Sequence, residues 1–291
     1  MTLVYRDFDQ QALDFQYNNQ AQVPDPTRYI DWYRTASETA RARVAHIRDV
    51  AYGNLPNERL DIFLPAGVSK SDRRPVVVFL HGGAWRNLDL AGSSFPAETF
   101  TARGTLYVSV GFSSMPAAKS LDEMAAQVRT ALAWLWLNIE SYGGDRNRLH
   151  LVGHSSGAHL GAMALGTDWL RLHGIPPGPV RSAVLVSGIY DLEPVRLSYR
   201  NEMLKLDRAA EIRNSPCRNL PVSGLPLLIG YGEFDTAEFK RQAHDFEAVW
   251  QRCYGNAARI ELAGLNHYET IETLVDPESP LSRATFGWFG I

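Results

Sequence analysis

The stretch LVGHSSGAHL, residues 151–160, decides the fold. It contains the pattern G-x-S-x-G, with Gly153 and Gly157 on either side of Ser155. The apolar run before it and the small residues after it predict a strand, a sharp turn and a helix. Glycines relieve crowding at such a turn, so the serine would project above a sheet edge. The bare pattern is weak evidence, because a chain with 23 glycines can match it by chance.

Short apolar runs rich in Val, Leu and Ile recur from residue 75 onwards. They occupy residues 75–80, 105–110, 148–153, 182–188, 225–232 and 258–264. Continuous runs of this length are typical of parallel strands covered on both faces. Helical patterns separate several of them, most clearly at residues 122–144 and at 236–253, where Thr236 is a candidate N-cap. The alternation predicts a single α/β domain over residues 1–291 with a mostly parallel sheet.

Two parts of the chain stand outside this alternation. The first 45 residues are polar and aromatic with helical spacing, and we expect one or two helices there, outside the main sheet. Two extended stretches, at residues 46–53 and 58–65, follow them. Residues 189–224 carry no strand pattern. We expect them to form a small helical cap over the carboxyl edge of the sheet, where ligands of such folds bind.

Composition excludes several classes of partner. The net charge is −3 without a long run of one sign, which argues against nucleic acid and anionic membranes. No apolar stretch approaches the roughly 20 residues that span a bilayer, and the first residues lack the pattern of a signal peptide. Cys217 and Cys253 form no metal or disulfide pattern. We expect a cytoplasmic protein with a small-molecule substrate and no metal or organic cofactor, and a homodimer is left open.

A second motif, His81-Gly82-Gly83-Ala84-Trp85, directly follows the strand expected at residues 75–80. In acyl transfer the carbonyl oxygen of the substrate becomes an oxyanion, which preorganised backbone N–H groups must hold. The candidate donors are the amides of Gly83, Ala84 and Ser156, the last being the residue after the serine of the first motif.

A serine hydroxyl becomes a nucleophile only when a histidine takes its proton and a carboxylate orients that histidine. With Ser155 as the candidate nucleophile, His267 is the candidate base, because it follows the last expected strand. Asp235 stands just past the strand before it and is the candidate acid. Glu233 and Asp191 are competing acids.

Two further histidines lie close to Ser155 in the sequence, and we expect both to be structural. His154 is the variable residue of the pattern, so its side chain should point away from Ser155. His159 lies one helical turn further on, at a position usually used to pack the helix against the sheet. Buried histidines of this kind are normally hydrogen-bonded to the surrounding protein.

These motifs resemble those of the arylformamidase (kynurenine formamidase) group of serine α/β-hydrolases, relatives of the hormone-sensitive-lipase-like esterases. The likeness runs from about residue 5 to the C-terminus. It is densest in LHGGAW, GHSSGAHL, VSGIYDLEP, RNSP, GEFDTAEFKRQ and the Asn266-His267 pair. The resemblance implies an α/β-hydrolase fold with helices on both faces of the sheet, and a catalytic triad of Ser155, Asp235 and His267.

Two positions depart from the family pattern. Ser156 stands where the family usually has Ala, but this position contributes its backbone N–H, so activity should survive. Related esterases often carry Tyr-x-x-Ala-Pro where this chain has Gly111-Phe112-Ser113-Ser114-Met115-Pro116. That stretch lines the approach to the site in relatives, so the departure bears on the substrate.

The resemblance implies hydrolysis of an aryl formamide, N-formyl-L-kynurenine, in tryptophan catabolism. A formyl group needs almost no pocket, whereas the aromatic leaving group needs a hydrophobic wall. The candidates for that wall are Trp85, Phe112, Tyr190 and Tyr199. A carboxylesterase for short acyl chains would use the same machinery and is the alternative. A non-catalytic binding module is disfavoured, because such modules usually lose a member of the triad.

Overall fold

The predicted strands pair into one eight-stranded sheet at the centre of the computed structural model, which describes residues 2–291. The β1–β2 and β2–β4 pairs are antiparallel, and the remaining pairs are parallel. The strand order is β1-β2-β4-β3-β5-β6-β7-β8. The expected mostly parallel sheet is therefore confirmed. The strands are β1 (His46–Ala51), β2 (Arg59–Phe63), β3 (Arg74–Leu80), β4 (Leu106–Val110), β5 (Gly144–His154), β6 (Val180–Val186), β7 (Leu227–Gly232) and β8 (Ala257–Leu262).

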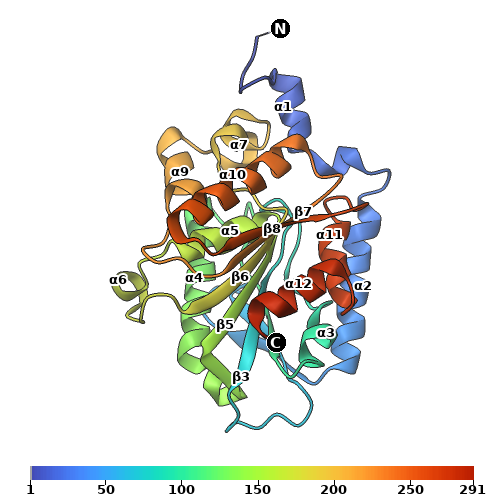
Figure 1. Ribbon diagram of the computed structural model, residues 1–291, viewed down its shortest axis with the longest axis vertical. Helices are drawn as coiled ribbons and strands as arrows, with labels where there is room; N and C mark the ends of the chain where they lie inside the picture. Colours follow the sequence, from blue (N-terminus) through green and yellow to red (C-terminus); the bar gives the residue numbers. More distant parts are fainter. Residues whose placement is uncertain (1) are drawn as a thin grey trace.

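Helices cover both faces of this sheet, which explains the continuous apolar runs (Figure 1). Val76, Val78 and Leu80 of β3 belong to one buried cluster. Val77 and Phe79 belong to the other. The helices of the first face are α4 (Leu121–Asn138), α5 (Ser156–Leu165) and α10 (Ala237–Tyr254). Those of the second face are α2 (Thr27–Arg43), α3 (Ala97–Thr101), α11 (Glu269–Glu272) and α12 (Pro280–Phe289).

The ends of the two long helices of the first face follow local signals in the sequence. Ser120 caps α4 by accepting a hydrogen bond from the Glu123 amide, and the left-handed Gly143 ends the short helix η3 (Ile139–Tyr142) that follows. Thr236 is the N-cap residue of α10, but its side chain makes no capping hydrogen bond. Its hydroxyl instead donates to the Gln16 carbonyl at 2.9 Å, so it binds the N-terminal segment in place of the first turn of α10.

The N-terminal segment and residues 189–224 meet beyond the carboxyl ends of the strands, where Figure 1 shows α1 and α7. Gln10 donates from its side chain to the Leu197 carbonyl at 3.0 Å, and the Tyr199 amide donates to the Asp14 carboxylate at 2.7 Å. The elements concerned are α1 (Gln10–Gln16), η1 (Asn19–Gln22), α7 (Glu193–Leu197), α8 (Asn201–Leu204), α9 (Arg208–Arg213) and η4 (Pro216–Arg218). The remaining short elements are η2 (Leu90–Gly92), α6 (Trp169–His173) and η5 (Thr273–Val275).

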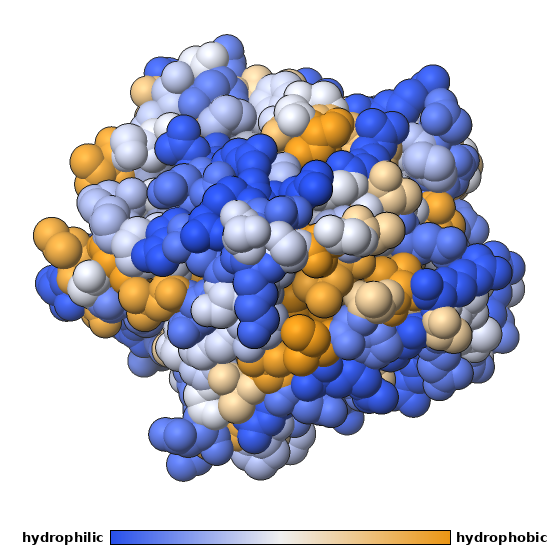
Figure 2. Space-filling view, turned by 90° about the horizontal axis from the view of Figure 1, so that it is seen from below, coloured by the Kyte–Doolittle hydropathy of each residue, from blue (hydrophilic) through white to orange (hydrophobic). Residues whose placement is uncertain are grey.

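The surface mixes polar and apolar side chains. Figure 2 shows the face seen from below, where hydrophobic patches are separated by hydrophilic ones. Among the most exposed large apolar side chains are Leu170 and Val222, which lie on different segments. Within residues 2–291, no helix combines the length and hydropathy needed to cross a membrane.

Three buried histidines contribute to the interior. His150 contacts the Ser182 hydroxyl at 2.8 Å and stacks on Phe289, with ring centroids 4.8 Å apart. Burial lowers the pKa of His150 to about 4, that of His154 to about 3 and that of His159 to about 4. All three side chains are therefore neutral at pH 7.

These histidines predict that the fold loses stability on acidification below about pH 6.5, the ordinary histidine pKa. Below that pH the histidines of the unfolded chain bind protons that the same histidines do not bind in the folded chain. The free energy of unfolding therefore decreases as the pH decreases. Each fully protonated unfolded histidine contributes a slope of about 1.4 kcal/mol per pH unit until its folded pKa is reached. Urea unfolding at successive pH values measures the slope. An unfolding free energy that stays constant between about pH 6.5 and pH 4.5 would contradict it.

The contact between α5 and β3 predicts that Gly157→Ala destabilises the protein. A Cβ at Gly157 would overlap the carbonyl oxygens of Leu80 and His81, both of them backbone atoms that cannot move independently. We expect a loss of about 1–3 kcal/mol in urea unfolding. Gly287→Ala is the matched control, because Gly287 lies in α12 with open space around the position of a Cβ. It should be neutral or stabilising, and equal losses for both variants would contradict the prediction.

Candidate active site

The turn between β5 and α5 presents the Ser155 side chain at the carboxyl edge of the sheet. Ser155 adopts φ 52° and ψ −120°, a conformation that residues other than glycine rarely occupy. Its amide donates to the Val186 carbonyl of β6 at 2.8 Å. Close packing at Gly153, where a Cβ would lie 2.7 Å from the Ala158 Cα, keeps the turn tight. The G-x-S-x-G pattern thus forms the strand–turn–helix that the sequence predicts.

The structure brings together the three residues expected to form the triad. His267 Nε2 lies 2.9 Å from Ser155 Oγ, and His267 Nδ1 lies 2.7 Å from Asp235 Oδ1. The serine stands at the end of β5, the aspartate after β7 and the histidine after β8. All three residues are buried. A proton can therefore pass from the hydroxyl to an imidazole whose other nitrogen is fixed by a carboxylate.

Two donors that the sequence did not reveal hold the Asp235 carboxylate. The Ser187 hydroxyl donates to Oδ2 at 2.6 Å, and the Gly232 amide donates to the same oxygen at 2.9 Å. Burial raises the pKa of Asp235, but the nearby His267 and these hydrogen bonds outweigh it, so the pKa is lowered overall. The carboxylate is thus charged and fixed in orientation beside His267. The only sequence signal was that Ser187 follows the β6 strand directly.

The side chain of His154 holds the backbone of His267. It does not take the place of the His267 imidazole beside Ser155. Its Nε2 donates to the His267 carbonyl at 2.9 Å, and the Thr270 hydroxyl donates to the same oxygen at 2.9 Å. Because burial lowers the pKa of His154 to about 3, its ring is neutral and its Nε2 carries the proton for this bond. The expected structural role of His154 is therefore confirmed.

His159 is structural too, but its partners differ from those expected. Its Nδ1 accepts a hydrogen bond from Trp85 Nε1 at 3.2 Å, and its Nε2 donates to the Asn214 carbonyl at 2.8 Å. The expectation that it packs α5 against the sheet is wrong, because it reaches the segment 189–224 instead. His159 thereby ties the loop after β3 to that segment.

The loop after β3 exposes backbone amides toward the same region. Gly83 and Ala84 have left-handed φ values of 108° and 54°. The amides of Arg86 and Asn87 both donate to the Gly83 carbonyl, at 2.9 and 2.8 Å, which fixes the loop. Within residues 2–291, the amides of Gly83 and Ala84 have no acceptor. Ser156 is the first residue of α5, where helical amides lack a partner in the preceding turn.

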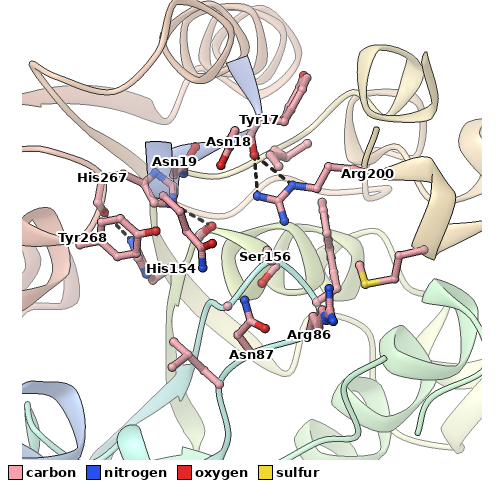
Figure 3. Close-up of a pocket in the computed structure, with 18 of the residues that line it drawn as sticks. Tyr17, Asn18, Asn19, Arg86, Asn87, His154, Ser156, Arg200, His267 and Tyr268 are labelled. Carbon is pink, nitrogen blue, oxygen red and sulfur yellow. Dashed lines mark hydrogen bonds between the residues drawn. The ribbon is translucent and has the colours of Figure 1, made fainter. Parts of the chain in front are cut away.

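A pocket of about 250 Å³ opens above Ser155, and it is lined by segments far apart in the sequence (Figure 3). It includes the expected residues Gly83, Ala84, Trp85, Ser156 and Tyr199. Sequence reasoning missed the other polar and aromatic residues of its wall. These include Tyr17, Asn18, Asn19, Gln20, Tyr33, Arg86, Asn87, Arg200, Glu202, Phe239 and Tyr268.

Two residues expected in the hydrophobic wall lie elsewhere. Phe112 stacks on His81 with ring centroids 4.2 Å apart, and it lines a different surface hollow. Tyr190 stacks on Phe246 of α10, also with centroids 4.2 Å apart, in the buried cluster of the first sheet face. Both rings are buried against other aromatic rings, so neither lines the pocket above Ser155.

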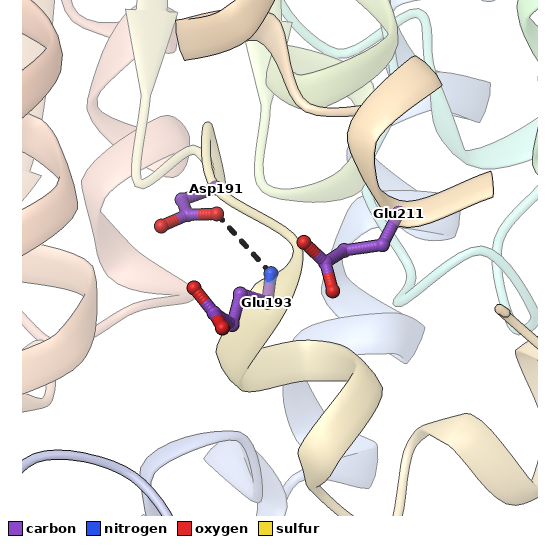
Figure 4. Close-up of side chains that lie close together, drawn as sticks. All are labelled: Asp191, Glu193 and Glu211. Carbon is purple, nitrogen blue, oxygen red and sulfur yellow. Dashed lines mark hydrogen bonds between the residues drawn. The ribbon is translucent and has the colours of Figure 1, made fainter. Parts of the chain in front are cut away.

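The competing acids do not contact His267. Glu233 accepts a hydrogen bond from the Gly264 amide at 2.7 Å. Asp191 accepts a hydrogen bond from the Glu193 amide at 3.2 Å, as a turn residue does. Its carboxylate also lies within 4.8 Å of those of Glu193 and Glu211 (Figure 4).

Arginines neutralise this group of three carboxylates. Arg196 and Arg208 contact Glu211 at 2.6 and 2.8 Å. Arg218 lies 3.8 Å from Asp191, and both Arg208 and Arg218 also approach Glu193. Because guanidinium groups already compensate the charge, we interpret the group as an ion-pair network that fixes α7 and α9, and not as a site for a metal ion.

Comparison with known proteins agrees with this geometry. Residues 60–170 match the family model described as BD-FAE. The kynurenine formamidases of Danio rerio and Salmo salar are 33% and 32% identical to the chain, and each alignment covers 90% of this chain and 88% of the relative. A candidate thioesterase from Silicibacter sp. TM1040, known as a crystal structure, is 25% identical with a TM-score of 0.81 over 93% of this chain and 97% of that one. The chain is therefore a serine hydrolase with the α/β-hydrolase fold, and it belongs to the kynurenine formamidase family.

Proposed function

We propose that this hydrolase cleaves an aryl formamide, with N-formyl-L-kynurenine as substrate. The observation that carries the proposal is the buried, hydrogen-bonded chain Ser155–His267–Asp235 beside unpaired loop amides. The membership in the kynurenine formamidase family selects the formamide among the bonds that such a site can cleave.

In the first half of the reaction, Ser155 Oγ attacks the formyl carbon while His267 Nε2, 2.9 Å away, accepts its proton. The amides of Gly83, Ala84 and Ser156 hold the oxyanion that forms on the former carbonyl oxygen. Asp235 stabilises the positive charge on His267. The imidazolium then protonates the aryl nitrogen, so that the C–N bond breaks and a neutral amine leaves.

In the second half, water takes the place of the amine next to His267. The imidazole accepts a proton from the water, which attacks the formyl ester of Ser155. The second tetrahedral intermediate collapses to formate, and His267 returns the proton to Ser155 Oγ. The same oxyanion site serves both halves, and the reaction consumes one water while Ser155 and His267 return to their starting state.

The pocket suits a small acyl group with an aromatic leaving group. Trp85 and Tyr199 line it, joined by Phe239, whose ring centroid lies 4.7 Å from that of His267, and by Tyr268. A formyl group occupies little of the roughly 250 Å³, so most of the space remains for the leaving group. Cleavage of short-chain esters by the same residues is the alternative that experiment has to separate.

Ser155→Ala tests the nucleophile. We expect kcat/KM for N-formyl-L-kynurenine to fall by about 10⁴-fold or more, because no other group can form the ester. The matched control is Ser156→Ala, which removes a neighbouring hydroxyl but keeps the backbone amide, and it should stay within about threefold of the native enzyme. Formate release measures both. Substantial activity in the folded Ser155→Ala variant would refute the assignment.

Substrate comparison tests the formamide proposal. We expect kcat/KM for N-formyl-L-kynurenine to exceed that for phenyl acetate, although the ester is intrinsically easier to cleave, because the pocket binds the larger leaving group in the transition state. Kinetics with both substrates under one set of conditions give the ratio. A preference for the acetate by about 100-fold or more would favour the carboxylesterase alternative.

A further inference from the structure

Arg200 places a guanidinium group in the pocket without a carboxylate partner. Its Nε and Nη2 both donate to the Tyr17 carbonyl, the first at 3.0 Å. Within residues 2–291, no carboxylate oxygen lies within 4.0 Å of this side chain, and its Nη1 makes no hydrogen bond. In Figure 3 the dashed lines run from Arg200 to Tyr17, and the remaining nitrogen points into the pocket, toward Ser156.

Two other shielded arginines of this protein are paired with carboxylates, whereas Arg129, whose Nε donates to the Thr167 hydroxyl at 2.9 Å, is not. Arg196 and Arg241 contact the buried Glu211 and Glu238 at 2.6 and 2.7 Å. Desolvating a charge is unfavourable unless an opposite charge and hydrogen bonds compensate it. Arg200 has only a neutral carbonyl, which fixes the guanidinium but does not neutralise it. A ligand that carries negative charge would supply the missing partner.

The charge of the surrounding wall has the same sign. Arg86 also lines the pocket, and its side chain forms no ion pair within the described part of the chain. Burial lowers the pKa of Arg200, and the nearby Arg86 lowers it further, so the two cations lie close enough to affect each other. Glu202 is the one acidic residue among those lining the pocket, and it is exposed. The pocket is therefore positive around Arg200.

We propose that Arg200 is the specificity-determining residue of this pocket, and that it binds a carboxylate on the leaving-group part of the substrate. This inference rests on the proposed formamide hydrolysis. In that reaction the formyl group is small, so the wall of the pocket contacts the amine part of the substrate. The free Nη1 donates to the carboxylate, and the Tyr17 carbonyl holds the guanidinium in the orientation required.

The experiment compares N-formyl-L-kynurenine with its carboxamide, which differs only in replacing the carboxylate by a neutral amide. We expect the native enzyme to prefer the carboxylate by about 10- to 150-fold in kcat/KM, the range for a charged hydrogen bond. Arg200→Gln should abolish this preference, so that the two formamides are hydrolysed with kcat/KM values within about threefold of each other. Arg200→Lys, which keeps the charge, should restore part of the preference.

The matched control is Arg43→Gln, which removes an exposed arginine paired with Glu98 outside the pocket. It should leave the preference unchanged. A preference for the carboxylate that persists in folded Arg200→Gln would overturn the proposal. So would a native enzyme that hydrolyses both formamides equally well.

A measurement on the native enzyme covers the case in which Arg200→Gln fails to fold. Kynurenine and kynurenine carboxamide are compared as inhibitors of phenyl acetate hydrolysis. Kynurenine should bind about 10-fold tighter or more, with the gap narrowing as salt is added. Equal inhibition at low salt would overturn the proposal. If neither formamide is hydrolysed while the ester is, the proposed function fails, and the inhibition ratio still decides whether the pocket selects a carboxylate.

Discussion

The backbone conformation of Ser155 is the constraint on which the rest of the site depends. At φ 52° and ψ −120° the residue is strained, and it persists because its surroundings over-determine it. Gly157 lies against the end of β3, and the Ser155 amide is bonded to β6. The turn therefore fixes the direction of the hydroxyl. The loops after β7 and β8 bring the Asp235 carboxylate and the His267 imidazole to it, and the loop after β3 brings amides that have no acceptor within residues 2–291.

The groups proposed to react with the substrate and most of the residues that line its pocket come from different parts of the chain. The strand ends carry the groups proposed to break and form bonds. Much of the pocket wall comes from the N-terminal segment and residues 189–224, which hold each other through contacts such as that between Arg200 and Tyr17. His159 links this wall to the loop after β3 through Trp85 and Asn214. The proposed chemistry and the proposed choice of leaving group thus depend on largely different residues.

Features encoded locally were predictable from the sequence, and features set by distant contacts were not. The apolar runs predict the strands because each is buried on both faces, and Ser155, Asp235 and His267 meet because each follows a strand of one sheet edge. Phe112 and Tyr190 were misplaced, since an aromatic side chain does not reveal which cavity it faces. The role of Tyr17 depends on a contact with Arg200 across 183 positions, which no local pattern records.

Covalent labelling tests the central claim most directly. A fluorophosphonate reacts with a serine hydroxyl only when a neighbouring base activates it and nearby amides hold the oxyanion. We predict one label per chain on the peptide that contains Ser155, located on Ser155 and not on Ser156, with formamide hydrolysis lost in proportion to labelling. Full labelling of Ser155 with hydrolysis retained, or loss of activity through a label on another residue, would contradict the account.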